Sequence, residues 1–397
     1  MAFDIFNSGS SYYNKYQNYD KDKDLSKQYT YQEIWNELFV EGKALPKTLK
    51  AEHRVILCDA DAVVYRVSAA CEQRAVVAEV AGAIVEFPTK TKLKTYCEES
   101  GVDFDGIEYQ DKVYVEPIQN CLSTLKKTVR KIYNRLDATH VIFFLGGADN
   151  FRLDLPLPDK YKGNRADMRR PEHLKACREY LNEYYTTYIV KGVEADDIVG
   201  GTTDFVINHT DAWGCAYNLD KDFNGTLTPS RYYNPTDDNI HELGGGLGSI
   251  HLKKGKVAGE GLHWLLFQVM MGDPSDGFTP KKFFKVRFGD KGYYDTFHHY
   301  TTEKELLYAW VKKWQELLPE EIKYKTWEGV DVEHDWLSLA NLYFQAPYMR
   351  TRPEDGTTFT DLLERYGLSG LTKENSIEGL RQGDVAYTIG DSKVVLL

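Results

Sequence analysis

The sequence predicts an α/β fold with a mostly parallel central sheet flanked by helices, followed by a helical C-terminal part. Two observations lead to this fold class. Short apolar runs that suit buried strands alternate with longer segments whose apolar residues recur at helical spacing. The segments between the runs are long enough to hold the crossover helices that join parallel strands. This alternation favours a doubly wound arrangement, in which helices cover the sheet.

Four strands and three connecting helices are expected in the central part of the chain. The helix at residues 118–136 carries its apolar residues on one face, and the last of the three helices is entered through Pro171, a residue suited to a first helical turn. The strands are expected at residues 55–58, 140–145, 187–190 and 213–217, and the helices at residues 62–73, 118–136 and 172–185.

The remaining segments define four expected regions. Residues 1–50 are interpreted as a flexible extension, because they begin with a polar stretch, and contain one short helix at 31–42. Residues 51–300 form the core, and the alternating pattern at 84–115 predicts a β-ribbon inserted into it. Residues 301–350 are expected to be a helical region packed on the core, with helices at 302–318 and 332–345, and residues 351–397 a C-terminal extension.

Composition excludes several classes of protein. The six cysteines form no Cys-x-x-Cys pair, so neither a zinc site nor a disulfide framework is expected. No apolar run reaches the roughly 20 residues that span a bilayer, which predicts a cytoplasmic protein. The formal net charge of −11 disfavours general affinity for nucleic acid. Local basic stripes beside an acidic pocket can nevertheless hold a polyanion.

Acidic residues follow each of the four predicted strands. Because the carboxyl ends of parallel strands lie at one edge of a sheet, acids that are distant in sequence should meet there. A further acidic pair follows the apolar helix at 264–271 and could join the same pocket. These acids are Asp59 and Asp61, then Asp149, then Glu194, Asp196 and Asp197, then Asp220 and Asp222, and finally Asp273 and Asp276.

Such a group of carboxylates requires cations, since like charges at contact distance repel strongly. Oxygen-only ligands select Mg²⁺ or Mn²⁺, and two such ions can activate water on one side of a phosphodiester and stabilise the leaving oxygen on the other. Each acid on its own is equally well explained as a helix cap, and Asp61 in particular as the cap of the helix at 62–73. Capping explains one acid at a junction, but not the three acids within residues 194–197.

Two segments combine basic and aromatic residues, as proteins that bind single strands do. The first follows Asp149 and the second follows Asp276. A solvated loop is the alternative for the first segment, and an amphipathic helix with Phe283 and Phe284 in the core for the second. The DNA-binding candidates in these segments are Arg152, Lys160, Tyr161, Arg169, Arg170, Lys281, Lys282 and Lys285.

Five motifs in order across residues 54–292 resemble those of the phage and bacterial 5′→3′ exonucleases, a PIN-like family related to flap endonucleases and to the exonuclease domain of bacterial DNA polymerase I. VILCDADAVVYRVSAACE is similar to the first metal-binding motif of this family, and ADNFRLDLPLPDKYKGNR to its Tyr-Lys-x-Asn-Arg motif. GVEADDIVGG, NLDKDFNG and MMGDPSDG are similar to its remaining acidic motifs. Each motif is weak alone, but five with compatible spacing are specific.

The resemblance implies roles for individual residues. Lys162 and Arg165 would position the scissile phosphate, and Tyr65 would stack near the site. After Asp276, the stretch that holds duplex DNA through a bound K⁺ in relatives retains only a candidate turn at 288–292, which contains Lys291. The implied metal ligands are Asp59, Asp149, Glu194 and Asp196 for the tighter ion, Asp220, Asp222, Asp273 and Asp276 for the second ion, and Asp197 in addition.

The resemblance therefore implies a Mg²⁺-dependent 5′→3′ exonuclease acting on the 5′ ends of duplex DNA in phage replication. Removal of flaps or of RNA primers, and contact with replication proteins, fit the same class. Two alternatives stay open. A PIN-like ribonuclease would share the acidic pocket, and a non-catalytic, structure-specific DNA-binding protein would keep the basic segments but tolerate loss of the acids.

Overall fold

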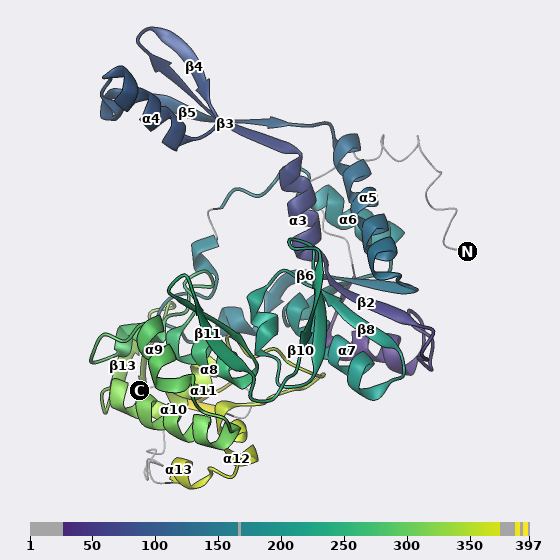
Figure 1. The fold of residues 1–397 in the computed structure, drawn as a ribbon, viewed down its shortest axis with the longest axis vertical. Coiled ribbons are helices and arrows are strands. Elements are labelled where there is room, and N and C mark those ends of the chain that lie inside the picture. The colour runs from purple at the N-terminus through teal and green to yellow at the C-terminus, as the bar shows by residue number, and fades with distance from the viewer. Residues whose placement is uncertain (1–26, 166–167, 374–385, 390–391, 396–397) are drawn as a thin grey trace. The chain divides into compact units, whose positions relative to one another are not determined.

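The computed structural model describes residues 27–165, 168–373, 386–389 and 392–395 (Figure 1). The described residues divide into two compact units. The first unit comprises Asp61–Asn134 and Arg169–Tyr185, and the second unit contains the rest. Residues 50 and 300 both lie inside the second unit, and the boundaries expected there stay a prediction. Within the described ranges, no helix is long and apolar enough to cross a membrane.

A seven-stranded sheet forms the centre of the second unit, in the order β1-β7-β6-β2-β8-β9-β10. Its strands pair in parallel except for the hairpin of β9 and β10. This confirms the predicted mostly parallel sheet, and all four expected strands are present. The strands are β1 Gln28–Tyr29, β2 Arg54–Asp59, β6 His140–Asn150, β7 Thr187–Gly192, β8 Trp213–Tyr217, β9 Ser230–Asn234 and β10 Asn239–Leu243.

One face of this sheet is covered by helices of the same unit. Helix α7 (Ala195–His209) packs on β2, β6 and β8, and α2 (Tyr31–Trp35) packs on β7 (Figure 1). A single apolar cluster joins Ile34 and Val199 of the helical layer to Leu57 and Phe144 of the sheet. β2 is buried almost throughout, as expected for an inner parallel strand.

The N-terminal part of the second unit begins inside the sheet. Gln28 and Tyr29 pair with Ile189 and Val190 of β7, and Thr30 caps α2 in a capping box. The π-helix η2 (Asn36–Val40) continues directly from α2. Residues 28–40 are therefore part of the folded unit, and the expected flexible stretch at residues 1–26 lies outside the described residues.

The C-terminal part of the second unit is mainly helical, as predicted. Its central helix α8 (Gly261–Met271) is buried at every position and lies in the largest apolar cluster. The helix expected at 332–345 begins only at Trp336, because Asp335 forms a capping box with Ser338 and the residues before it form β14. The segment at 281–287 is not an amphipathic helix but begins with the short 3-10 turn η7, although Phe283 and Phe284 pack against the core as the alternative predicted.

The remaining elements of the second unit connect and surround α8. The 3-10 turns are η4 Phe151–Asp154, η5 Gly163–Arg165, η6 Lys221–Gly225 and η7 Pro280–Phe283. The strands are β11 Ser249–Lys253, β12 Lys256–Glu260, β13 Ile322–Lys325, β14 Asp331–His334, β15 Ala386–Ile389 and β16 Ser392–Val395. The helices are α9 Asp290–Phe297, α10 Glu303–Leu317, α11 Trp336–Phe344, α12 Phe359–Arg365 and α13 Gly370–Lys373.

The first unit contains the inserted segment, which is more than the β-ribbon predicted from its alternating pattern. Strands β4 and β5 of this segment pair with β3, which precedes the segment, in an antiparallel sheet of order β4-β3-β5, and residues 90–100 form a helix rather than a strand. Thr89 caps this helix, and Leu93 and Cys97 bury one side of it, a spacing of four residues that suits a helix. The elements of this unit are α3 Ala60–Ala70, β3 Glu72–Val80, β4 Ala83–Phe87, α4 Lys90–Ser100, η3 Phe104–Gly106, β5 Tyr109–Val115, α5 Ile118–Leu136 and α6 Leu174–Tyr184.

Candidate metal centre

Acidic residues follow three parallel strands of the second unit and influence one another. Asp59 is the last residue of β2, Asp196 lies in the first turn of α7 after β7, and Asp220 caps η6 after β8. Burial raises the pKa of Asp196 well above its usual value, and the charges of Asp59, Asp220 and Glu194 raise it further. The acids of β2, β7 and β8 thus share one electrostatic environment at the carboxyl edge of the sheet.

Asp196 occupies the most repulsive position of this environment. Among the residues that the structure describes, its Oδ1 atom is buried and has no hydrogen-bond partner. The charge of Lys162 lowers the pKa of Asp196 but does not overcome the effects of burial and of the neighbouring acids. A buried carboxylate oxygen without a donor is costly unless a cation satisfies it.

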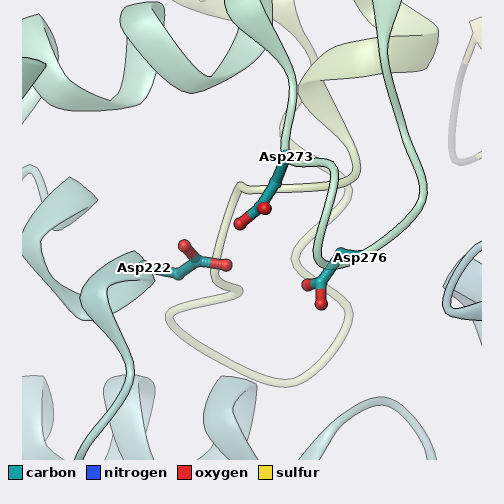
Figure 2. A group of neighbouring side chains, drawn as sticks. All are labelled: Asp222, Asp273 and Asp276. Carbon is teal, nitrogen blue, oxygen red and sulfur yellow. The ribbon is translucent and has the colours of Figure 1, made fainter. Parts of the chain in front are cut away.

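A second group of acids comes together beside η6. Asp222, Asp273 and Asp276 each direct a carboxylate oxygen toward a common point, and these oxygens lie within 4.8 Å of one another (Figure 2). Burial, followed by the charges of Asp220 and Asp276, raises the pKa of Asp222 to about 7. Three carboxylates at this separation match the donor set of a hard divalent cation.

The turn after α8 positions two members of this triad. Gly272 ends α8 with a φ of +73°, and a Cβ atom there would lie 2.4 Å from the carbonyl oxygen of Phe278. The backbone N–H of Asp273 donates to that carbonyl, at 2.9 Å. Only glycine combines this dihedral angle with this close approach, so Gly272 allows the backbone turn that positions Asp273 and Asp276.

Asp273 and Asp276 differ in their hydrogen bonds. Asp273 accepts from Lys221 Nζ at 2.7 Å and from the backbone N–H and hydroxyl of Ser275. Burial alone would raise the pKa of Asp273, but these donors hold it below its usual value. The pKa of Asp276 is raised by burial despite Lys162 and Arg165, and its carboxylate accepts from the Tyr161 hydroxyl at 3.1 Å.

Lys162 and Arg165, which the motif resemblance assigns to the scissile phosphate, lie among these carboxylates. Lys162 Nζ is 2.7 Å from Glu194 Oε1 and 3.9 Å from Asp276 Oδ2. Arg165 donates to Asp276 and to the carbonyl oxygen of Ser275. Both bases are therefore placed where they can neutralise charge on a group bound at the acidic cluster.

Asp197 has a structural environment that conflicts with its predicted role as a metal ligand. It is fully buried and accepts two hydrogen bonds from Arg152, at 2.6 and 2.9 Å. It also accepts the backbone N–H groups of Glu194 and Arg350, both at 3.0 Å. Four donors occupy its two oxygens, so we assign Asp197 to holding the start of α7 rather than to binding a metal ion.

Arg152 and Tyr161 are buried, which conflicts with the DNA contact that the sequence predicted for them. Arg152 is 2% exposed, and in addition to Asp197 it donates to the carbonyl oxygens of Ala346 and Tyr348. Tyr161 is also 2% exposed, because its ring packs in the core near Phe278 and only its hydroxyl reaches the acids. Neither side chain can offer a surface to DNA.

Two other acids at strand ends lie in different surroundings. Asp149 lies near the end of β6 and is exposed, and no interaction described for the second unit links it to the acidic cluster. Asp61 forms an ion pair with Arg178 of α6 within the first unit. For Asp61 this agrees with a local structural role, whereas the metal role of Asp149 stays a prediction.

The other DNA-binding candidates are exposed to different extents and have varied partners. In the first unit, Tyr65 is 41% exposed, Arg170 is exposed, and Arg169 pairs with Glu72. In the second unit, Lys160 lies over the ring of Trp327, and Lys282 pairs with Asp159. Lys281 is half-buried, and Lys285 and Lys291 are exposed. Their contact with DNA stays a prediction, as does a bound K⁺ at 288–292, where Asp290 accepts the backbone N–H of Val257.

Sequence reasoning missed two polar residues of the site. Lys221 stands between Asp220 and Asp222 and pairs with Asp273. Gln268 on α8 donates its amide to Asp222, and its own Oε1 atom is buried without a partner among the described residues. A single glutamine in the otherwise apolar run WLLFQVMM was the available signal for the latter.

The chemistry of this donor set fits divalent cations. Carboxylate oxygens of Asp222, in η6, and of Asp273 and Asp276, in the turn after α8, lie within 4.8 Å of one another, and no cysteine or histidine belongs to this triad. The buried Oδ1 atom of Asp196 accepts no hydrogen bond from the described residues, and a bound cation would satisfy it. Hard ions such as Mg²⁺ and Mn²⁺ prefer such oxygen-only surroundings.

Comparison with known proteins finds similar solved structures, while no protein-family model and no curated protein matches the chain. A mutant of the 5′-exonuclease of bacteriophage T5 is 14% identical, with a TM-score of 0.41, and the match covers 81% of this chain and 99% of that chain. The T5 flap endonuclease in a pseudo-enzyme-product complex with DNA and metal ions is 19% identical, with a TM-score of 0.38, covering 64% and 88%. T5 5′-exonuclease with bound zinc is 15% identical, with a TM-score of 0.38, covering 81% and 92%.

Proposed function

We propose that this protein is a Mg²⁺- or Mn²⁺-dependent nuclease that hydrolyses DNA from 5′ ends. The observation that carries the proposal is that carboxylate oxygens of Asp222, Asp273 and Asp276 lie within 4.8 Å of one another. In addition, the buried Oδ1 atom of Asp196 has no hydrogen-bond partner among the described residues. Carboxylates gathered in this way repel one another, and bound divalent cations relieve the repulsion. Ion pairs neutralise part of the arrangement, since Lys221 pairs with Asp273 and Arg165 pairs with Asp276. They do not account for Asp196, whose pKa is raised by burial and by the neighbouring acids.

Two groups of ligands support a site for two ions. Asp59, Glu194 and Asp196 would hold one ion, and Asp222, Asp273 and Asp276 the other. Asp220 lies close enough to raise the pKa of both Asp196 and Asp222. When bound, such ions activate a water molecule and stabilise the leaving oxygen of a phosphodiester. The water oxygen bonds to phosphorus as the ester P–O bond breaks, so no side chain needs to act as nucleophile.

The side chains around the acids have separate tasks in this proposal. Lys162 and Arg165 bind the phosphate and stabilise the negative charge that develops on it. Tyr161 orients the carboxylate of Asp276 through its hydroxyl, and Gln268 orients that of Asp222. Arg152 and Asp197 fix the first turn of α7 and therefore the position of Asp196.

The polarity and the substrate follow from the resemblance of the five sequence motifs to 5′→3′ exonucleases. We propose 5′ ends of duplex DNA as the substrate, with flaps and RNA primers as related substrates and phage DNA replication as the setting. A PIN-like ribonuclease is the second candidate, because an acidic pocket of this kind does not by itself distinguish DNA from RNA. The non-catalytic DNA-binding protein is disfavoured, because a protein that binds no metal ion would not require a buried carboxylate among other acids, as at Asp196.

The Asp196→Asn variant tests the proposal. Duplex DNA labelled at either the 5′ or the 3′ end, and RNA of the same sequence, would be incubated with Mg²⁺. We expect the native chain to release label from 5′ ends of DNA, and the variant to lose about 10³-fold or more of this activity. Asp61→Asn is the matched control, because Asp61 pairs with Arg178 and should be dispensable for hydrolysis.

Each outcome of this experiment discriminates between the candidates. Equal activity of Asp196→Asn and the native chain would refute the metal centre. Release from RNA alone would favour the ribonuclease, and binding of DNA without any hydrolysis would favour the non-catalytic protein.

A further inference from the structure

Three bases of the candidate metal centre each donate to one of its carboxylates. Lys162 Nζ is 2.7 Å from Glu194 Oε1, and Lys221 Nζ is 2.7 Å from Asp273 Oδ2. Arg165 pairs with Asp276. These contacts occupy carboxylate oxygens that the proposed function assigns to metal ions. A carboxylate oxygen that is paired with an ammonium or guanidinium group binds a divalent cation less strongly, because the two positive charges compete for it.

The side chains of these bases are accessible to solvent. The exposed fractions of the Lys162, Arg165 and Lys221 side chains are 25%, 47% and 52%. By contrast, the side chain of Arg152 is 3% exposed and also donates to two backbone carbonyl groups. The Arg152 pair is therefore fixed, whereas the three other bases can leave their carboxylates and remain solvated.

The loop that carries Lys162 and Arg165 is anchored without these charged contacts. The backbone N–H of Lys162 donates to the carbonyl oxygen of Asp276 at 2.7 Å. The amide of Asn164 donates to the carbonyl oxygens of Pro274 and Ser275 at 3.1 and 3.3 Å. The two charged side chains can therefore exchange partners while their backbone stays beside the acidic cluster.

We propose that Lys162, Arg165 and Lys221 are resident counter-ions that metal ions displace, and that the displaced Lys162 and Arg165 are thereby made available to the phosphate of the substrate. This inference rests on the proposed function and adds a coupling to it. Metal ions and these bases compete for Glu194, Asp273 and Asp276. Bound metal ions then promote phosphate binding by releasing cations that were neutralised within the protein, as well as by their own charge.

Competition predicts that removal of a base strengthens metal binding. Mn²⁺ binding to the full chain would be measured by titration calorimetry without DNA, at pH 8. We expect Lys162→Met and Lys221→Met each to tighten Mn²⁺ binding by about threefold to tenfold, because each removes a cation that occupies a ligand.

Lys160→Met is the matched control for a change in net charge. Lys160 is two residues from Lys162, and its ammonium group lies over the ring of Trp327, 4.4 Å from the ring centroid. We expect its Mn²⁺ affinity to stay within about twofold of the native value, since a distant exposed charge is screened. Unchanged or weaker Mn²⁺ binding by Lys162→Met and Lys221→Met would overturn the inference, as would an equal gain in Lys160→Met.

The release of the two bases is tested by DNA binding. Fluorescence anisotropy of a labelled duplex would be compared in EDTA and in Ca²⁺, which takes the same oxygen ligands. Ca²⁺ should strengthen DNA binding by the native chain more than by the Lys162→Met, Arg165→Met double variant, in which only the charge of the ion contributes. An equal gain in both proteins would contradict the release of the bases.

These results separate the inference from the proposed function. A native chain that binds no Mn²⁺ and hydrolyses no nucleic acid would refute the function and, with it, the exchange. A native chain that binds Mn²⁺ and hydrolyses DNA, but whose affinity does not respond to Lys162→Met or Lys221→Met, would refute the exchange alone.

Discussion

The neighbouring residues Asp196 and Asp197 in the first turn of α7 have opposite surroundings. Asp197 is fully buried, and four N–H donors from Arg152, Glu194 and Arg350 satisfy its oxygens. Asp196 faces other acids, and its buried Oδ1 atom has no partner among the described residues. The first carboxylate is neutralised by its donors, whereas the charge of Lys162 only partly offsets the acids around the second.

This difference shows how the fold holds repulsive charges in place. The Arg152–Asp197 pair fixes the start of α7 because Arg152 also donates to the carbonyl oxygens of Ala346 and Tyr348, which precede α12 in the chain. Such a fixed pair allows an adjacent carboxylate to stay in an unfavourable position. Functional sites commonly keep local repulsion that the surrounding structure must overcome.

The largest predicted effect concerns the fixed pair. Arg152→Met leaves Asp197 buried without its charged partner, so we expect the free energy of unfolding to fall by about 3–5 kcal/mol. Urea unfolding in EDTA measures this change. Lys282→Met, which removes one partner of an exposed pair with Asp159, is the control and should change stability by less than about 1 kcal/mol. A loss for Arg152→Met no larger than that of the control would show that the pair does not hold α7.

The sequence predicted four of the seven strands of the sheet, because each of these four has an apolar run that suits burial on both faces. It did not predict β1, β9 or β10. Residues 54–59 and 213–217 needed only this local signal, and both are strands of the parallel sheet. The signal failed at residues 90–100, where alternating polar residues suggested a strand. There the cap at Thr89 and burial of Leu93 and Cys97 against the adjoining sheet determine a helix. Tertiary packing of this kind is not visible in a local pattern.

The candidate site was predicted in composition more than in the roles of its residues. Acids at strand ends selected Asp196 and Asp222, and the acidic pair after the apolar helix at 264–271 added Asp273 and Asp276. This pattern could not separate Asp197 from Asp196, because that difference depends on Arg152 and on a backbone N–H 153 residues away in the chain. Lys221 was missed for a similar reason, since its partner Asp273 becomes a neighbour only after folding.

The next prediction concerns the repulsion among the acids at Asp222, measured as the dependence of stability on pH. Burial and the neighbouring Asp220 and Asp276 raise the pKa of Asp222 from 3.8 to about 7 in the folded, metal-free chain. The folded state therefore binds more protons than the unfolded state between about pH 4 and pH 7, and the stability contributed by protonated Asp222 is lost as pH rises through this window. Asp222→Asn removes the titrating group and retains an oxygen that can accept from Gln268.

In EDTA, the native chain and Asp222→Asn should have similar stability near pH 4. By pH 7.5 we expect the variant to be more stable by about 2–4 kcal/mol, with partial exposure of the side chain reducing the upper value. Saturating Mn²⁺ should reverse the order, because it stabilises only the chain that retains the ligand. Parallel stability profiles of the two proteins across this pH range would mean that Asp222 is not under electrostatic stress.

A smaller effect is expected at Tyr161, which connects the apolar core to the acidic cluster. The ring of Tyr161 belongs to the core, while its hydroxyl donates to Asp276. Tyr161→Phe keeps the ring and removes one hydrogen bond to a charged group, so we expect a loss of about 1–2 kcal/mol of stability in EDTA. Affinity for duplex DNA should stay within about twofold, because a buried ring cannot stack on a base.

Tyr65→Ala provides the opposite case, since Tyr65 is 41% exposed and the sequence motifs assign it to stacking on DNA. We expect this variant to keep its stability within about 0.5 kcal/mol and to weaken DNA binding by about 1 kcal/mol. If Tyr161→Phe weakened DNA binding more than Tyr65→Ala did, the hydroxyl of Tyr161 would contact the substrate. Tyr161 would then belong to the residues that bind substrate, and not to those that only support the structure of the site.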